Sequence, residues 1–213
     1  MADLAKLRDA IIDGDAKSAK AVTESAIAEG MDPQTLLSEI MIPAMDVVGS
    51  RFECGEYFVP ELLIAARAMK GCLELLRPLL AKNGAKSAGK VAIGTVKGDL
   101  HDIGKNLVAA MLEGGGFEII DLGVDVAPEK FVAAVQEKGA TIVCLSALLT
   151  TTMPAMKDTI AALKATGLRE RCKVMIGGAP ITDAYAKEIG ADGYSDNASS
   201  AVALARKLSS AAA

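Results

Sequence analysis

The segment KVAIGTVKGDLHDIGKN, residues 90–106, runs from a short apolar stretch through a polar loop into the start of a helix. The apolar, β-rich stretch recurs downstream at residues 117–123, 141–146, 173–177 and, weakly, 192–195. Helical periodicity is found between and after these stretches, at residues 102–113, 128–138, 153–166, 181–189 and 197–209. Strands that alternate with helices and are apolar on both faces predict an α/β fold. We therefore expect a flavodoxin/Rossmann-like, doubly wound parallel sheet of five strands.

The first 82 residues contain no strand-like run, and apolar residues recur there every three or four positions. Helices are predicted at residues 3–12 and 15–29, from the Asp32-Pro33 pair onward with a kink at Pro43, and from about residue 59 to 80. We expect a four-helix bundle cap over residues 1–84 and an α/β domain over residues 85–213. The small, polar segment AKNGAKSAGK, residues 81–90, is predicted to be the linker and a hinge.

Composition excludes several classes of protein. The chain of 213 residues has a net charge of −4, no Trp and four Phe, so it offers neither a basic field nor stacking platforms for nucleic acid. Its N-terminus is charged, and no apolar run reaches the roughly 18 residues that span a bilayer. We predict a cytoplasmic protein with no nucleic-acid or membrane partner.

The four cysteines lie far apart in the sequence and form no C-x-x-C pair. We interpret them as buried free thiols, because neither a thiolate metal site nor a redox dithiol fits this spacing. The chain has a single histidine, His101, so a Cys- or His-rich zinc site cannot be assembled from it.

His101 falls in the loop after the first predicted strand, at the carboxyl edge where doubly wound sheets bind ligands. The glycines at 94, 98 and 104 do not fit G-x-G-x-x-G, no Gly-Lys-Ser/Thr is present, and the third strand ends without the aspartate of a phosphoacceptor. One alternative is that Asp99 or Asp102 caps the next helix and His101 is only a polar neighbour. The other is a metal ligand, whose second ring nitrogen bonds a nearby carboxylate such as Asp99. One imidazole cannot hold a bare ion, so that metal would arrive inside a macrocycle.

Asp99-x-His101-x-x-Gly104 matches the D-x-H-x-x-G signature of cobalamin-binding domains. The surrounding segments DLGVDV (121–126), SALLTT (146–151) and IGGAP (176–180) match as well. The chain resembles the cobalamin-binding module of methionine synthase and the corrinoid proteins of anaerobic methyltransferase systems. The resemblance covers nearly the whole chain, since those proteins also carry a helical cap.

This resemblance implies a cobalamin, as methylcobalamin, cob(I)alamin or a related corrinoid, bound base-off with His101 as the axial ligand of cobalt. It implies that Asp99 and Thr152 form a proton relay with His101, with Thr152 at the family's serine position. When cobalt loses its methyl group, His101 should dissociate and a proton should enter this pair. Phe58, with Leu62, would cover the upper face from the segment RFECGEYFVPELL (51–63), unless Phe58 is bundle core. The cofactor-binding residues expected are Gly98, Asp99, His101, Asp102, Ile103, Gly104, Ser146, Leu148, Thr150, Gly177, Gly178, Ala179 and Phe58.

The function implied is a methyl carrier that shuttles between a substrate-specific methyltransferase and a corrinoid:acceptor methyltransferase that uses tetrahydrofolate or a thiol, with a reductive activator. By itself the carrier is not a complete enzyme. Two alternatives remain open: a cobalamin-responsive regulator, and the small subunit of an adenosylcobalamin mutase. The acidic N-terminal half, with nine Lys and Arg against thirteen Asp and Glu, argues against a DNA-reading head. The presence of the helical half argues against the mutase subunit.

Overall fold

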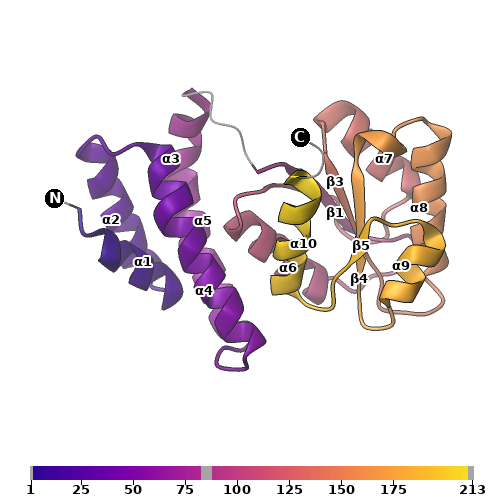
Figure 1. Ribbon diagram of the computed structural model, residues 1–213, viewed down its shortest axis with the longest axis horizontal. Helices are drawn as coiled ribbons and strands as arrows, with labels where there is room; N and C mark the ends of the chain where they lie inside the picture. Colours follow the sequence, from indigo (N-terminus) through magenta and orange to yellow (C-terminus); the bar gives the residue numbers. More distant parts are fainter. Residues whose placement is uncertain (1, 83–87, 211–213) are drawn as a thin grey trace. The chain divides into compact units, whose positions relative to one another are not determined.

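The computed structural model describes residues 2–82 and 88–210. The chain forms two compact units, one of residues 1–87 with 113–116 and one of residues 88–112 with 117–213 (Figure 1). The boundary predicted at residues 84 and 85, and the middle of the predicted hinge at 81–90, lie outside the described residues. Below, the first is called the helical unit and the second the α/β unit.

The helices of the helical unit are α1 (Leu4–Ile12), α2 (Ala16–Ala28), α3 (Pro33–Thr35), η1 (Leu36–Met41), α4 (Ile42–Glu53) and α5 (Val59–Lys82). The first three helices each begin at an aspartate whose carboxylate accepts a backbone N–H three residues on. These caps are Asp3, Asp15 and Asp32. An N-cap carboxylate satisfies a donor that the helix itself cannot, which explains why the helices start where the sequence predicted.

The predicted kink at Pro43 takes the form of a widened turn. Residues of η1 form a π-helix that continues directly into α4, and the N–H of Ile42 donates to the carbonyl of Leu37, five residues back. Pro43 has no N–H to donate, and a π-turn is one way in which a helix accommodates an interrupted ladder. The prediction that the segment at residues 51–63 begins the last helix is only partly right. It holds the end of α4, a turn and the start of α5.

The strands and helices of the α/β unit are β1 (Lys90–Thr95), α6 (Ile103–Gly114), β2 (Glu118–Asp121), α7 (Pro128–Lys138), β3 (Ile142–Ser146), α8 (Pro154–Ala165), η2 (Arg169–Arg171), β4 (Lys173–Gly177), α9 (Asp183–Ile189), β5 (Gly193–Tyr194) and α10 (Ala198–Ser210). Among the described residues the sheet has five parallel strands in the order β2-β1-β3-β4-β5. Helices α6 and α10 cover one face, and α7, α8 and α9 cover the other (Figure 1). The predicted α/β class and doubly wound order are confirmed.

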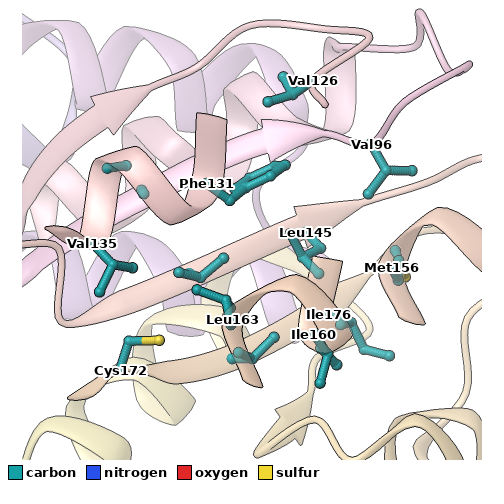
Figure 2. Packing of buried hydrophobic residues seen from close by; sticks show 14 of the residues in the cluster. Val96, Val126, Phe131, Val135, Leu145, Met156, Ile160, Leu163, Cys172 and Ile176 are labelled. Atoms are coloured by element: carbon teal, nitrogen blue, oxygen red, sulfur yellow. The ribbon is translucent and has the colours of Figure 1, made fainter. Parts of the chain in front are cut away.

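One hydrophobic core of this unit lies between the sheet and the helices α7, α8 and α9 (Figure 2). Phe131 of α7 is fully buried against β1, where Gly94 leaves room for its ring. A Cβ on Gly94 would come within 2.9 Å of the Phe131 ring, so this glycine is needed for close helix–strand packing. The sheet that carries the site is thus fixed by dense apolar packing beneath it.

No helix in the described ranges is long and apolar enough to cross a membrane. Three of the four cysteines are buried, as predicted, but Cys54 is exposed, so the prediction was wrong for it. Cys54 follows directly after α4, where the chain turns toward α5 and no element covers its side chain.

Candidate functional site

The candidate site lies at the carboxyl edge of the sheet in the α/β unit. Thr95, Ser146 and Gly177 are register partners across β1, β3 and β4, so these three strands end at the same level. The loops that follow them leave from this common edge. They carry most of the residues that the sequence nominated, including Asp99 and His101 after β1.

Asp99 is the centre of the polar network at this edge. Its side chain is fully buried, and Oδ1 accepts the backbone N–H of His101 at 3.0 Å and lies 2.7 Å from His101 Nδ1. Oδ2 accepts the N–H of Leu148 at 2.8 Å and the hydroxyl of Thr152 at 2.7 Å. Asp99 therefore does not cap α6, and its carboxylate ties the loop after β1 to the loop after β3.

The charge of Asp99 is stabilised although the group is buried. Burial by itself raises the pKa of this carboxyl. The hydrogen bonds from the N–H groups of His101 and Leu148, from the Thr152 hydroxyl and from the His101 ring outweigh burial, so the pKa of Asp99 lies well below its usual value. The group is an anion throughout the physiological range.

This anion determines how His101 presents its ring. A carboxylate can only accept, so the 2.7 Å contact places the proton of the neutral imidazole on Nδ1 and leaves the lone pair on Nε2. The His101 side chain is 50% exposed. Its backbone carbonyl accepts the hydroxyl of the buried Thr95 at 2.9 Å, which ties the loop to the strand end. The arrangement offers one oriented nitrogen ligand to a molecule at the edge.

A bare metal ion does not fit the site. No group of three or more His, Cys, Asp or Glu side chains capable of holding an ion occurs in the part of the chain that the structure describes. Exposed apolar side chains occur on the same loops as His101 and its partners and at the first residue of α6. They belong to Leu100, Ile103, Val124, Leu148 and Leu149. Exposed apolar side chains on the loops that carry one oriented polar group fit a large ligand with apolar faces, bound through a single metal–nitrogen bond.

The three glycines predicted to admit the cofactor differ in how much space the protein leaves for a side chain at each position. A Cβ on Gly104 would meet nothing within 4 Å, so the first turn of α6 opens to space. Gly178 has φ +133°, and a Cβ there would lie 1.9 Å from the carbonyl oxygen of Ala147. A Cβ on Gly177 would lie 3.1 Å from the carbonyl oxygen of Ser195. Gly178 is thus required by the fold itself, whatever ligand binds.

The other nominated residues are distributed as follows. The exposed Gly98 precedes Asp99, Ser146 ends β3, and the exposed Thr150 and Ala179 lie in the loops after β3 and β4. Asp102 uses its carboxylate to accept the side-chain amide of Asn106, at 3.0 Å.

Two predicted residues belong to the helical unit. Phe58, just before α5, is 65% exposed, so the alternative that it is bundle core is wrong. Leu62 is fully buried inside the helical unit. The predicted role of Phe58 over the cofactor stays a prediction.

Sequence reasoning missed two polar contacts at this edge. The ammonium of Lys105, almost completely buried in α6, donates to both carboxylate oxygens of Asp121 at 2.7 Å. Asp125 accepts the N–H of Gly98 at 2.7 Å. All of these residues fall in the quoted segments 90–106 and 121–126, but spacing alone does not show which of them pair.

Comparison with known proteins adds the family. The chain matches a family model described as "B12 binding domain" over residues 89–203 and a second of the same description over residues 4–77. It is 44% identical over 211 residues to a corrinoid protein of Desulfitobacterium hafniense, covering 98% of each chain. It is 45% identical over 206 residues to dimethylamine corrinoid protein 1 of Methanosarcina acetivorans, covering 96% of each. A chain in the crystal structure of the methanol:cobalamin methyltransferase complex of Methanosarcina barkeri superposes with a TM-score of 0.86 at 29% identity, covering 97% of this chain and 79% of that one.

Proposed function

The chain belongs to the corrinoid proteins with B12-binding domains and takes a corrinoid as its cofactor, and we propose that it carries a methyl group between two methyltransferases. The observation that supports this most is the hydrogen-bonded series His101, Asp99 and Thr152 at the open carboxyl edge. Relatives matched over nearly their whole length are corrinoid proteins named for methylamines, which supports the carrier role over a mutase subunit or a regulator.

The residues of the site fit a corrinoid. His101 Nε2 is oriented by the bond from Nδ1 to Asp99 and would be the lower axial ligand, with the cofactor in the base-off state. The exposed apolar side chains on the neighbouring loops would contact the edge of the macrocycle. The open space at Gly104 would admit the nucleotide arm, with Ser146 and Thr150 as hydroxyl partners. A bound corrinoid supplies a cobalt ion that accepts a methyl group from one partner and releases it to another.

The chain's own residues supply a place for a proton. The lone pair on Nε2 is where a proton would enter the His101–Asp99 pair when this nitrogen is not a ligand, and Asp99 Oδ1 lies 2.7 Å from Nδ1 on the other side of the ring. The hydroxyl of Thr152 and the N–H of Leu148 keep the opposite carboxylate oxygen hydrogen-bonded in both states. Ligand release and proton uptake at His101 are therefore coupled.

We expect a substrate-specific methyltransferase to load the carrier. A second methyltransferase, with tetrahydrofolate or a thiol as acceptor, would unload it, and a reductive activator would restore an oxidised cofactor. The cytoplasmic location stays a prediction.

Loading and unloading can be measured directly. Full-length protein reconstituted with cobalamin and reduced is treated with isotopically labelled iodomethane and passed over a desalting column. We expect about one label per bound corrinoid, released by a corrinoid:thiol or corrinoid:tetrahydrofolate methyltransferase with its acceptor. Label that neither enzyme removes, together with a reaction that requires adenosylcobalamin, would overturn the carrier proposal.

The His101→Ala variant identifies the residue responsible. We expect it to retain much less corrinoid on the column and to have a changed visible spectrum. Lys187→Ala is the matched control, because Lys187 is exposed on α9 and pairs with Asp183, one turn earlier on the same helix. The control should retain corrinoid as the wild type does.

A further inference from the structure

The turn after β2 is bonded directly to the loop that carries His101. Asp125 Oδ1 accepts the N–H of Gly98 at 2.7 Å, and the N–H of Asp125 donates to the carbonyl of Asp99 at 2.9 Å. Gly98 lies 27 positions before Asp125 in the chain, and Asp99 follows it. These are therefore not the local bonds by which an aspartate usually stabilises its own turn. We call this pair of bonds the Asp125 clamp.

Asp125 holds an unfavourable backbone conformation to make these bonds. Its φ is +50°, and it is the one non-glycine residue with positive φ in the described ranges. The left-handed region costs free energy for any residue with a Cβ, although Asp and Asn tolerate it better than most. The next residue anchors the turn, because the N–H of Val126 donates to the carbonyl of Thr95 at 3.0 Å. Such conformations persist where surrounding bonds determine them, often beside functional groups.

The clamp and the side-chain network hold different parts of the same residue. Leu148 and Thr152 bond the carboxylate of Asp99, whereas Asp125 bonds its main-chain carbonyl and the N–H of Gly98 before it. Gly98 has φ +84°, is exposed and carries no side chain, so no side-chain contact restrains this residue. Apart from the clamp, the main chain of this loop is tied to the end of β1 by the N–H of Asp99 on the carbonyl of Val96, at 3.1 Å, and by the hydroxyl of Thr95 on the carbonyl of His101. The clamp adds the restraint from the turn after β2, at Gly98 and at the carbonyl of Asp99.

We propose that Asp125 is a positioning residue for the axial ligand: its clamp fixes the Gly98–Asp99 backbone and thereby the ring orientation and tautomer of His101. The role in cobalt ligation rests on the proposed function, but the orientation of the ring is a property of the protein alone. It can therefore be tested without cofactor.

Three substitutions separate the acceptor from the conformation. Asp125→Asn keeps an acceptor oxygen and the tolerance for positive φ, and it removes only the charge. Asp125→Gly keeps the conformation accessible and removes the acceptor, whereas Asp125→Ala removes the acceptor and disfavours the conformation. We expect the Asn variant to behave like the wild type, the Gly variant to be impaired, and the Ala variant to be impaired most.

The first measurement uses apo-protein at a pH where the imidazole is neutral. Because His101 is the only histidine, labelling with ¹⁵N-histidine gives NMR signals from this ring alone. The wild type and Asp125→Asn should show the Nδ1–H tautomer, and the Gly and Ala variants a mixture. Hydrogen exchange of the Gly98 amide should accelerate about tenfold in the latter two, the factor that corresponds to losing one hydrogen bond. Far-ultraviolet circular dichroism establishes that each variant is folded.

The second measurement asks whether cobalt ligation follows the ring. The fraction of bound Co(II) corrinoid with a histidine nitrogen ligand should fall in the same order as the tautomer population. A Gly98 amide that loses protection while the tautomer stays unchanged would overturn the proposal, as would an Asn variant that behaves like Ala. Wild-type protein with no histidine ligation would instead count against the proposed function, and the apo-protein result would still decide the role of the clamp.

Discussion

The two units of the chain differ in what they bury. In the described part of the helical unit, Thr23 is the one buried polar side chain, and it bonds the carbonyl of Ala19 in its own helix at 2.8 Å. At the site edge of the α/β unit four polar side chains are buried. These are Thr95, Asp99, Lys105 and Thr152. A buried polar group costs free energy unless it is bonded, so the α/β unit maintains by hydrogen bonds an arrangement that packing alone would not favour. We therefore expect substitutions of these buried polar residues to change both the stability of the α/β unit and the geometry of its site.

The largest loss of stability should follow from removing the carboxylate of Asp99, the central hydrogen-bond acceptor of the site. Asp99→Ala removes the acceptor of the Leu148 N–H and leaves the hydroxyl of the buried Thr152 with the carbonyl of Leu149 as its remaining acceptor. We expect a loss of about 3–5 kcal/mol in the free energy of unfolding, measured by urea denaturation of apo-protein, together with loss of the Nδ1–H tautomer of His101. A variant that keeps both would show that the network does not couple stability to the site.

A core substitution in the helical unit should cost a similar amount without changing the site. Leu7 is fully buried in α1, and Leu7→Ala removes apolar contacts and leaves a cavity. The expected loss is about 2–4 kcal/mol in the same denaturation measurement. The ¹⁵N signals of the His101 ring in the folded apo-protein should stay as in the wild type. A shifted tautomer would contradict the separation of roles between the two units.

Two buried threonines offer a matched pair. Thr152 donates to a carboxylate at 2.7 Å, whereas Thr23 donates to a helix carbonyl. Thr152→Val should cost about 1.5–3 kcal/mol, because a bond to a charged group is lost, and Thr23→Val should cost less than about 1 kcal/mol. Denaturation curves of the two variants give the difference directly. Equal costs would mean that the charge of Asp99 contributes little to holding the edge together.

The smallest expected difference between the two units is in the reactivity of their buried cysteines, which should be low in both. Burial raises the pKa of Cys72 in the helical unit, that of Cys144 to about 12, and that of Cys172 to about 11. At pH 8 these thiols stay protonated and covered, so only the exposed Cys54 should react quickly with iodoacetamide. Mass spectrometry of the labelled native protein should find one modification. Fast labelling at Cys144 or Cys172 would contradict the dense packing of the sheet.

The periodicity of apolar residues was enough to predict the strands, the helices and the parallel order, because burial on both faces of the sheet leaves a strong pattern in the sequence. The D-x-H-x-x-G spacing placed Asp99 beside His101, and the family resemblance nominated Thr152. The structure then brings Thr152 within 2.7 Å of Asp99.

Contacts between residues far apart in the sequence were not predictable in the same way. Asp125 meets Gly98 because the loops after β1 and β2 leave from the same edge of the sheet, and Lys105 of α6 meets Asp121 at the end of β2. No spacing in the sequence marks either pair. Exposure at turns was also missed, as for Cys54, because it depends on which element happens to cover a side chain.

The account depends on a bond between the His101 ring and cobalt, and the single histidine makes this bond directly measurable. Protein grown with ¹⁵N-histidine is loaded with cobalamin, reduced to Co(II) and examined by electron paramagnetic resonance. With unlabelled histidine, each cobalt line should split into three through one ¹⁴N axial ligand, and labelling should change this to two. A three-line splitting that persists after labelling would mean that the cofactor's own base remains the ligand, and it would contradict the role assigned to His101.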